Sequence, residues 1–259
     1  MKVQPRLALL ALALMLVASA SAAPIDITVS GPVFNTAGLE TARNAWLAGN
    51  PYSILEDFES FVWDQTTGNG YTTLNTATLG TFEVAQSALG STALFPDGVN
   101  GPVGGTGLAE LLILTNAQTR FGGRFNTTPG GQNWLDTNDI TDFSLTLDYV
   151  TNTLFFFITD VEDVGDPGLI RFAVTAGQDN EDTVFSNIVL ANGASFFVGI
   201  RADNPITSVR WYTTETEDGF GIDDFGVMNA RTEIPEPSTY VLLGSALLGA
   251  AFFRSRRRA

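Results

Sequence analysis

Short runs of β-forming residues, separated by turn-forming residues, cover most of the chain and constrain its fold more than any other feature. About eleven such runs, each of roughly four to eight residues, are interrupted by Gly, Pro, Asn or Asp. This spacing is typical of an all-β protein, and it predicts an antiparallel β-sandwich of jelly-roll-like form. The runs are 53–59, 81–84, 110–114, 119–125, 143–149, 153–159, 169–175, 183–190, 195–201, 206–213 and 220–227.

Two of these runs indicate how their strands are buried. In the run 143–149, apolar residues alternate with Ser144, Thr146 and Asp148, which predicts a strand with one face in water. The run 154–158 has the sequence LFFFI and no polar side. We therefore expect this strand to be covered on both faces and to lie at the centre of the core.

One short helix is expected near the start of the folded body. Thr36 is the predicted N-cap, and Gly49 and Pro51 end the segment. The apolar residues between them share one face, so the helix should pack on the body through Leu39, Ala42, Trp46 and Leu47.

The chain contains no cysteine and no histidine, which excludes several classes of site. A Ser/His/Asp triad, a thiol nucleophile, a disulfide and a Cys/His zinc site all need one of these residues. Six of the 13 basic residues lie near the two ends, so the segment from Asp26 to Glu236 carries 28 acids and seven arginines. So acidic a body should repel nucleic acid and offer carboxylates to metal ions or polar polymers.

Residues 1–22 have the layout of a secretory signal peptide. Two basic residues precede an apolar run at 7–17, and small residues follow it. This run is too short to span a bilayer, which needs about 20 residues. The sequence predicts export by the Sec machinery and cleavage by signal peptidase after Ala22, which leaves a β-sandwich domain at 23–232.

The C-terminal segment, residues 233–259, has its own three-part pattern. The triplet Pro235-Glu236-Pro237 precedes an apolar transmembrane helix expected at 239–253, and the arginine-rich tail 254–258 follows. The helix would be roughly 22 Å long, which is short for a hydrocarbon core of about 30 Å. Its arginines should stay on the cytoplasmic side and leave the body outside.

This order of elements resembles the PEP-CTERM sorting signal of Gram-negative bacteria. The resemblance implies that Pro235, Glu236 and Pro237 form a processing motif, which a membrane-embedded exosortase recognises and cuts. The helix would then hold the protein transiently in the inner membrane, with the body in the periplasm, before release to the cell surface or the extracellular space. The resemblance also implies an association with exopolysaccharide and biofilm.

The body is also similar to a group of exported PEP-CTERM proteins of uncharacterised function. The similarity rests on four short motifs, and it implies a lectin-like β-sandwich without established catalytic residues. The motifs lie at 55–59, 157–160, 196–200 and 218–225.

Two acidic stretches, 159–166 and 217–225, contain the candidate metal ligands. In the second stretch, strict alternation puts Asp224 on the same face as Phe220 and Asp223 on the same face as Phe225, so one acid would be buried in either case. A β-bulge at the Asp pair would instead let both phenylalanines point inward and leave the acids at the edge.

A buried carboxylate needs a cation or several hydrogen-bond donors. Oxygen ligands favour Ca²⁺ over transition metals, so a structural calcium site is one interpretation. Solvated acidic turns are the other, and the sequence does not decide between them. The candidate ligands are Asp160, Asp163, Asp223 and Asp224, with Asp57 or Glu59 contributing from the first strand.

Two classes of function are compatible with these features. The first is a non-enzymatic surface or matrix protein that binds extracellular polysaccharide through exposed aromatic rings. Among Trp46, Trp63, Trp134 and Trp211, we expect Trp134 to be the exposed one, because the segment 130–134 resembles a loop. The alternative is a secreted glycoside hydrolase or lyase that uses paired carboxylates. Glu59, Glu83 and Glu110 could serve, but nothing selects a pair, so no catalytic residue is assigned.

Overall fold

The computed structural model describes eight stretches of the body: residues 25–61, 70–87, 110–116, 123–137, 140–161, 170–184, 191–213 and 219–229. The predicted signal peptide and the C-terminal segment lie outside these described residues, and so do Trp63 and Asp163. Within the described stretches, no helix is both long enough and apolar enough to cross a membrane.

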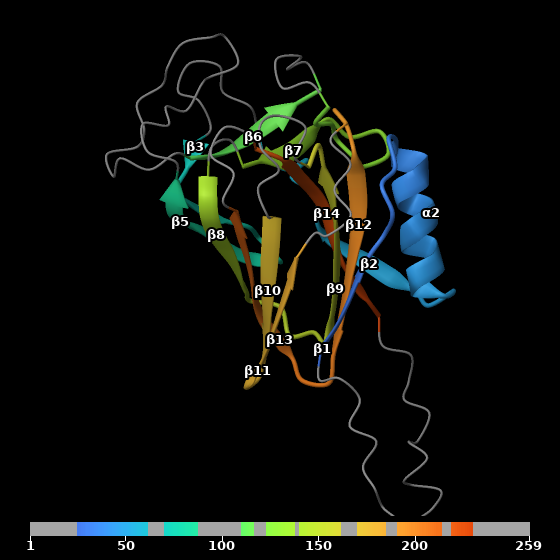
Figure 1. Ribbon diagram of the computed structural model, residues 1–259, viewed down its shortest axis with the longest axis vertical. Helices are drawn as coiled ribbons and strands as arrows, with labels where there is room; N and C mark the ends of the chain where they lie inside the picture. The colour runs from blue at the N-terminus through green and yellow to red at the C-terminus, as the bar shows by residue number, and fades with distance from the viewer. Residues whose placement is uncertain are drawn as a thin grey trace, which may run out of the picture.

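Two antiparallel sheets form the body, as Figure 1 shows. Sheet A has the order β1 (Ile25–Val29), β12 (Ser195–Ala202), β9 (Thr153–Thr159), β14 (Gly221–Met228), β7 (Asn133–Asp136), β6 (Leu111–Thr115) and β3 (Gly70–Tyr71), and β2 (Tyr52–Glu56) pairs with β14. Sheet B has the order β11 (Asp179–Val184), β10 (Ile170–Ala176), β13 (Ile206–Thr213), β8 (Ile140–Leu147), β5 (Gly80–Ser87) and β4 (Thr73–Asn75). The predicted all-β, antiparallel fold is confirmed.

Aromatic rings from both sheets meet in the core between them. Phe156 of β9 lies 5.4 Å from Trp211 of β13, measured between ring centroids, and Phe82 of β5 lies 5.6 Å from Phe225 of β14. Trp211 also stacks on Phe143 at 5.0 Å. Such rings supply much of the buried apolar surface of a small sandwich. Trp211 is therefore a core residue and is fully buried.

Strand β9 is covered on both faces, as its apolar run predicts. Its inward side chains, Leu154, Phe156 and Ile158, belong to the core between the sheets. Phe155 and Phe157 point the other way, into a second cluster with Leu39 and Leu47 of the helix. The alternation expected in β8 is also confirmed, because Phe143 and Leu145 are buried and Thr146 is exposed.

The single described helix, α2 (Thr36–Leu47), lies against the outer face of sheet A (Figure 1). Its N-cap is Asn35 and not the predicted Thr36, because the Asn35 Oδ1 atom accepts a 2.9 Å hydrogen bond from the Gly38 amide. Trp46 packs against the sheet, 5.6 Å from Phe197 between ring centroids. The helix therefore closes part of the outer face of sheet A.

Candidate functional site

Residues 123–132, which we call the strap, cover another part of the outer face of sheet A. Phe125 packs into the apolar cluster beneath α2. Neighbouring strap residues contact acidic side chains of the sheet: Arg124 pairs with Asp136, and Thr127 hydrogen-bonds Asp223. The strap thus brings polar donors onto carboxylates that would otherwise face water.

Strand β14 contains the β-bulge that was one of the two interpretations of its sequence. Its pairing with β9 shifts register between Asp223 and Gly226, and Asp224 has a positive φ of 53°. As a result Phe220 and Phe225 both point into the core. The acids are not at the edge, as that interpretation expected, because the strap covers them: Asp223 is 0% and Asp224 2% exposed.

Strap donors surround the Asp223–Asp224 pair. The Asp223 Oδ2 atom accepts hydrogen bonds from the Thr127 amide at 2.7 Å and from the Thr127 hydroxyl at 2.9 Å. The Asp224 Oδ1 atom accepts from the Thr128 hydroxyl at 2.7 Å. Burial raises the pKa of Asp223 well above the usual value, and the nearby charge of Asp224 raises it further. Burial also raises the pKa of Asp224.

Glu59 anchors the far end of the strap. Its Oε1 atom accepts three N–H groups: the Asn126 side chain at 2.8 Å, the Gln132 amide at 2.7 Å and the Asn133 amide at 2.7 Å. Asn126 also donates to Asp223 Oδ2 at 3.3 Å, so it links the two carboxylates. The charge of Asp57 contributes to the raised pKa of Asp224. The structure therefore gathers four of the six predicted acids in one region.

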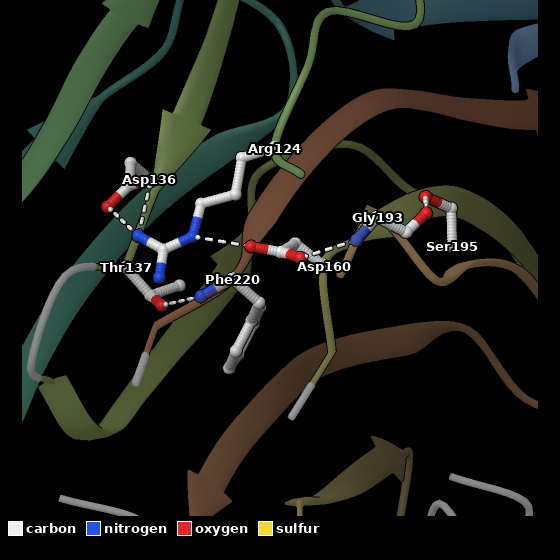
Figure 2. A network of polar contacts seen from close by, with 7 residues as sticks. All are labelled: Arg124, Asp136, Thr137, Asp160, Gly193, Ser195 and Phe220. Atoms are coloured by element: carbon white, nitrogen blue, oxygen red, sulfur yellow. Dashed lines mark hydrogen bonds and ion pairs between the residues drawn. The ribbon is translucent and has the colours of Figure 1, made fainter. Parts of the chain in front are cut away.

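Asp160 belongs to a different network, shown in Figure 2. Arg124 lies between two buried carboxylates, with its Nη1 atom 2.9 Å from Asp136 and its Nε atom 3.5 Å from Asp160. The Gly193 amide donates to Asp160 Oδ1 at 2.7 Å. Asp160 thus pairs with an arginine instead of joining Asp223 and Asp224.

Sequence reasoning did not identify the strap side chains that bind these acids. One sequence signal points to a residue such as Arg124. A buried carboxylate needs a cation, and the body has seven arginines that could supply it. No local pattern points to Asn126, Thr127 or Thr128, because they lie about 100 residues from their partners.

The predicted calcium site remains a prediction. Across the stretches that the structure describes, no three Asp, Glu, His or Cys side chains form a group able to hold a metal ion. Asp223, Asp224 and Glu59 accept hydrogen bonds from the strap. Their observed role is therefore to hold the strap on the sheet.

The expected exposure of Trp134 is wrong. Trp134 lies within strand β7, is 1% exposed and packs with Leu112 and Leu114 of β6. The segment is a strand because residues 133–136 pair with β6, and part of it also pairs with β14. So enclosed a ring presents no free face for stacking on a sugar.

The three glutamates considered for catalysis lie on different elements. Glu59 follows β2 and binds the strap. Glu83 is exposed on β5 of sheet B, and Glu110 directly precedes β6 of sheet A.

Comparison with protein families identifies the C-terminal segment. Residues 233–258 match the family model of the PEP-CTERM protein-sorting motif. The chain carries a PEP-CTERM motif at its C-terminus. The motif implies an exported protein that crosses the membrane and is recognised by an exosortase. No curated protein and no solved structure matches the chain.

Proposed function

We propose that this chain is a non-enzymatic, exosortase-processed protein of the cell surface or extracellular matrix, with a lectin-like sandwich that associates with exopolysaccharide in a biofilm. The PEP-CTERM motif at 233–258 carries the proposal. The charge supports it, since an acidic body avoids anionic lipid and nucleic acid and stays soluble outside the cell. In this proposal the PEP-CTERM motif serves delivery, and the sandwich is what is delivered.

Cell fractionation tests the delivery step. We expect the wild-type body at the surface or in the medium of a host with an exosortase, and in the membrane fraction when the exosortase gene is deleted. Glu236→Ala should reproduce the deletion, because it alters the processing triplet. Thr232→Ala, just outside the matched segment, is the control and should behave as wild type. Identical fractionation of all four samples would contradict the proposal.

Affinity electrophoresis in gels that contain the producer's own exopolysaccharide tests the binding step. The exposed tyrosine rings are now the better stacking candidates, since Tyr52 is 37% and Tyr149 41% exposed. We expect Tyr52→Ala or Tyr149→Ala to reduce the retardation of the protein, and the buried Trp134→Phe to leave it unchanged. Absence of retardation in the wild type would contradict the proposed binding of polysaccharide. Unchanged retardation in both tyrosine variants would contradict stacking of the polysaccharide on these rings.

A further inference from the structure

The C-terminal end of the described body is fixed at one end of the sandwich. Strand β14 ends at Met228, whose amide donates to the Thr153 hydroxyl at 3.0 Å. The next residue, Asn229, donates its amide to the Pro51 carbonyl at 2.8 Å, and its side chain is hydrogen-bonded to the Ser53 hydroxyl. We call this end of the sandwich the exit pole, because the chain continues from here to the PEP-CTERM motif.

The N-terminal strand starts at the same pole. Ile25, the first residue of β1, pairs with Ala202 at the end of β12, and the Ala202 amide donates to the Asn152 carbonyl at 2.9 Å. Asn152 directly precedes Thr153, which is hydrogen-bonded to Met228. The segments before β1 and after β14 therefore join the body at the same pole.

Exposed apolar side chains gather at the exit pole. Among the described residues, five large apolar side chains are exposed, and three of them lie here: Tyr52, Tyr149 and Val150. Val150 is 81% exposed and, like Tyr149, belongs to the connection between β8 and β9, just before Asn152. Tyr52 pairs with Met228. Tyrosine is enriched where lipid meets water, because one end of its ring is apolar and the other is polar.

The chain between the body and the membrane is short. Residues 230–238 separate Asn229 from the apolar segment 239–253, which is predicted to cross the membrane. Fully extended, this connection reaches at most about 35 Å. A body of about 200 residues has a radius of gyration of about 17 Å, and therefore a diameter of about 40 Å. While the C-terminal segment is attached, the exit pole must therefore face the membrane.

The charges at the exit pole select the kind of lipid that it can meet. Asp148 directly precedes Tyr149, Asp203 directly follows Ala202, and both acids are exposed. Anionic lipid would repel them, so the pole suits a zwitterionic phospholipid surface. So few apolar side chains bind a bilayer weakly on their own. The covalent connection compensates, because it holds the pole at a high local concentration beside the bilayer.

We propose that the exit pole contacts the zwitterionic phospholipid surface of the inner membrane through Tyr149 and Val150 while the C-terminal segment is attached. This inference rests on the proposed function, because it needs the apolar segment to be in the membrane. The contact keeps the PEP triplet close to the membrane surface, where a membrane-embedded exosortase cuts.

Fluorescence quenching in the full-length chain tests this contact, because the chain has no cysteine of its own and a single labelled cysteine is unique. Asn204→Cys places a fluorophore on an exposed residue of the exit pole and leaves Tyr149 and Val150 intact. Phe34→Cys is the matched control at the opposite pole, since Phe34 is exposed and follows Val33, which pairs with Ser195 at the other end of β12.

The labelled chains are placed in phosphatidylcholine nanodiscs that carry a quencher on the lipid headgroups. We expect the label at 204 to lose most of its fluorescence and the label at 34 to lose little. Combining Tyr149→Ser and Val150→Ser with Asn204→Cys should restore most of the fluorescence without changing the melting temperature, because both side chains are exposed. Replacing part of the phosphatidylcholine with phosphatidylglycerol should also weaken the quenching.

Equal quenching at 204 and 34 would overturn the contact. Quenching at 204 that persists in the Tyr149→Ser, Val150→Ser chain would also overturn it, because the connection alone would then hold the pole near the bilayer. Stronger quenching with phosphatidylglycerol would overturn the choice of zwitterionic lipid. Failure of the chain to enter nanodiscs would contradict the proposed delivery and this contact together, whereas the first two results contradict the contact alone.

Discussion

Single carboxylates hold the strap on the sheet, and Glu59 is one of them. One oxygen of Glu59 accepts three N–H groups of residues 126, 132 and 133. The negative charge strengthens each of these bonds, and a hydrogen bond to a charged group is stronger than one between neutral groups. Glu59 was predicted as a metal ligand or a catalytic acid, and its observed partners are those of an anchor for the strap.

We expect Glu59→Gln to lower the free energy of unfolding by about 1 to 3 kcal/mol, because the neutral amide keeps one acceptor but loses the charge. Urea denaturation measures the change. Glu83→Gln on the exposed face of β5 is the matched control, and it should change the free energy by less than about 0.5 kcal/mol. Equal effects of the two substitutions would show that Glu59 does not anchor the strap.

Arg124 is the second residue on which the strap depends. It neutralises part of the charge of Asp136 and Asp160, which are 0% and 2% exposed. We expect Arg124→Met to cost about 3 to 5 kcal/mol in urea denaturation, because two buried carboxylates would lose their cation.

The pair Arg210–Asp142 provides the control for Arg124, because its arginine lies largely in solvent although Asp142 is buried. The Arg210 side chain is 55% exposed, so Arg210→Met should cost about 0 to 1 kcal/mol. A loss in Arg124→Met as small as that of the control would indicate that the buried network does not stabilise the fold.

At the scale of elements, the helix packs closely against Gly199 of β12. A side chain at Gly199 of β12 would meet the Trp46 ring, since its Cβ atom would lie 2.5 Å from the ring. We expect Gly199→Ala to displace Trp46 and lower the free energy of unfolding by about 1 to 3 kcal/mol. Trp46 fluorescence and urea denaturation report the two effects.

Gly31 is the matched position for this substitution, because a Cβ atom there would meet nothing within 4 Å. Gly31→Ala should therefore leave both the fluorescence and the stability near the wild-type values. If Gly199→Ala behaved in the same way, close packing between α2 and β12 would not contribute to docking.

Local sequence patterns predicted the strands well where the pattern of apolar and polar residues reflects burial alone. The apolar run of β9 and the alternation in β8 correctly gave two-sided and one-sided burial. The bulge in β14 was one of two interpretations, and the need to bury both phenylalanines selects it. Trp134 was misplaced because the glycines and Asn133 before it resemble a loop, although residues 133–136 complete sheet A.

The strap could not be predicted, because its function depends on contacts between distant parts of the chain. Thr127 lies 96 residues from Asp223 in sequence, and Asn126 lies 67 residues from Glu59. Periodicity indicates which side of a strand faces the core, but it does not indicate which polar segment covers the other side.

At the scale of the whole molecule, the two sheets have different surroundings. The outer face of sheet A is covered in part by α2 and by the strap, whereas residues such as Thr146 and Arg210 on the outer face of sheet B are exposed and polar. The PEP-CTERM motif follows this body in the chain at 233–258. In the proposed function, the acidic sandwich is delivered out of the cell and its C-terminal segment is then removed.

Intact-mass spectrometry of the mature protein, from a producing host with and without its exosortase, tests this account most directly. We predict an N-terminus at Ala23 in both strains. In the strain with the exosortase, the chain should end near Pro235-Glu236-Pro237, and without the enzyme it should keep the apolar segment and the arginine-rich tail. The same C-terminus at Ala259 in both strains would contradict the account.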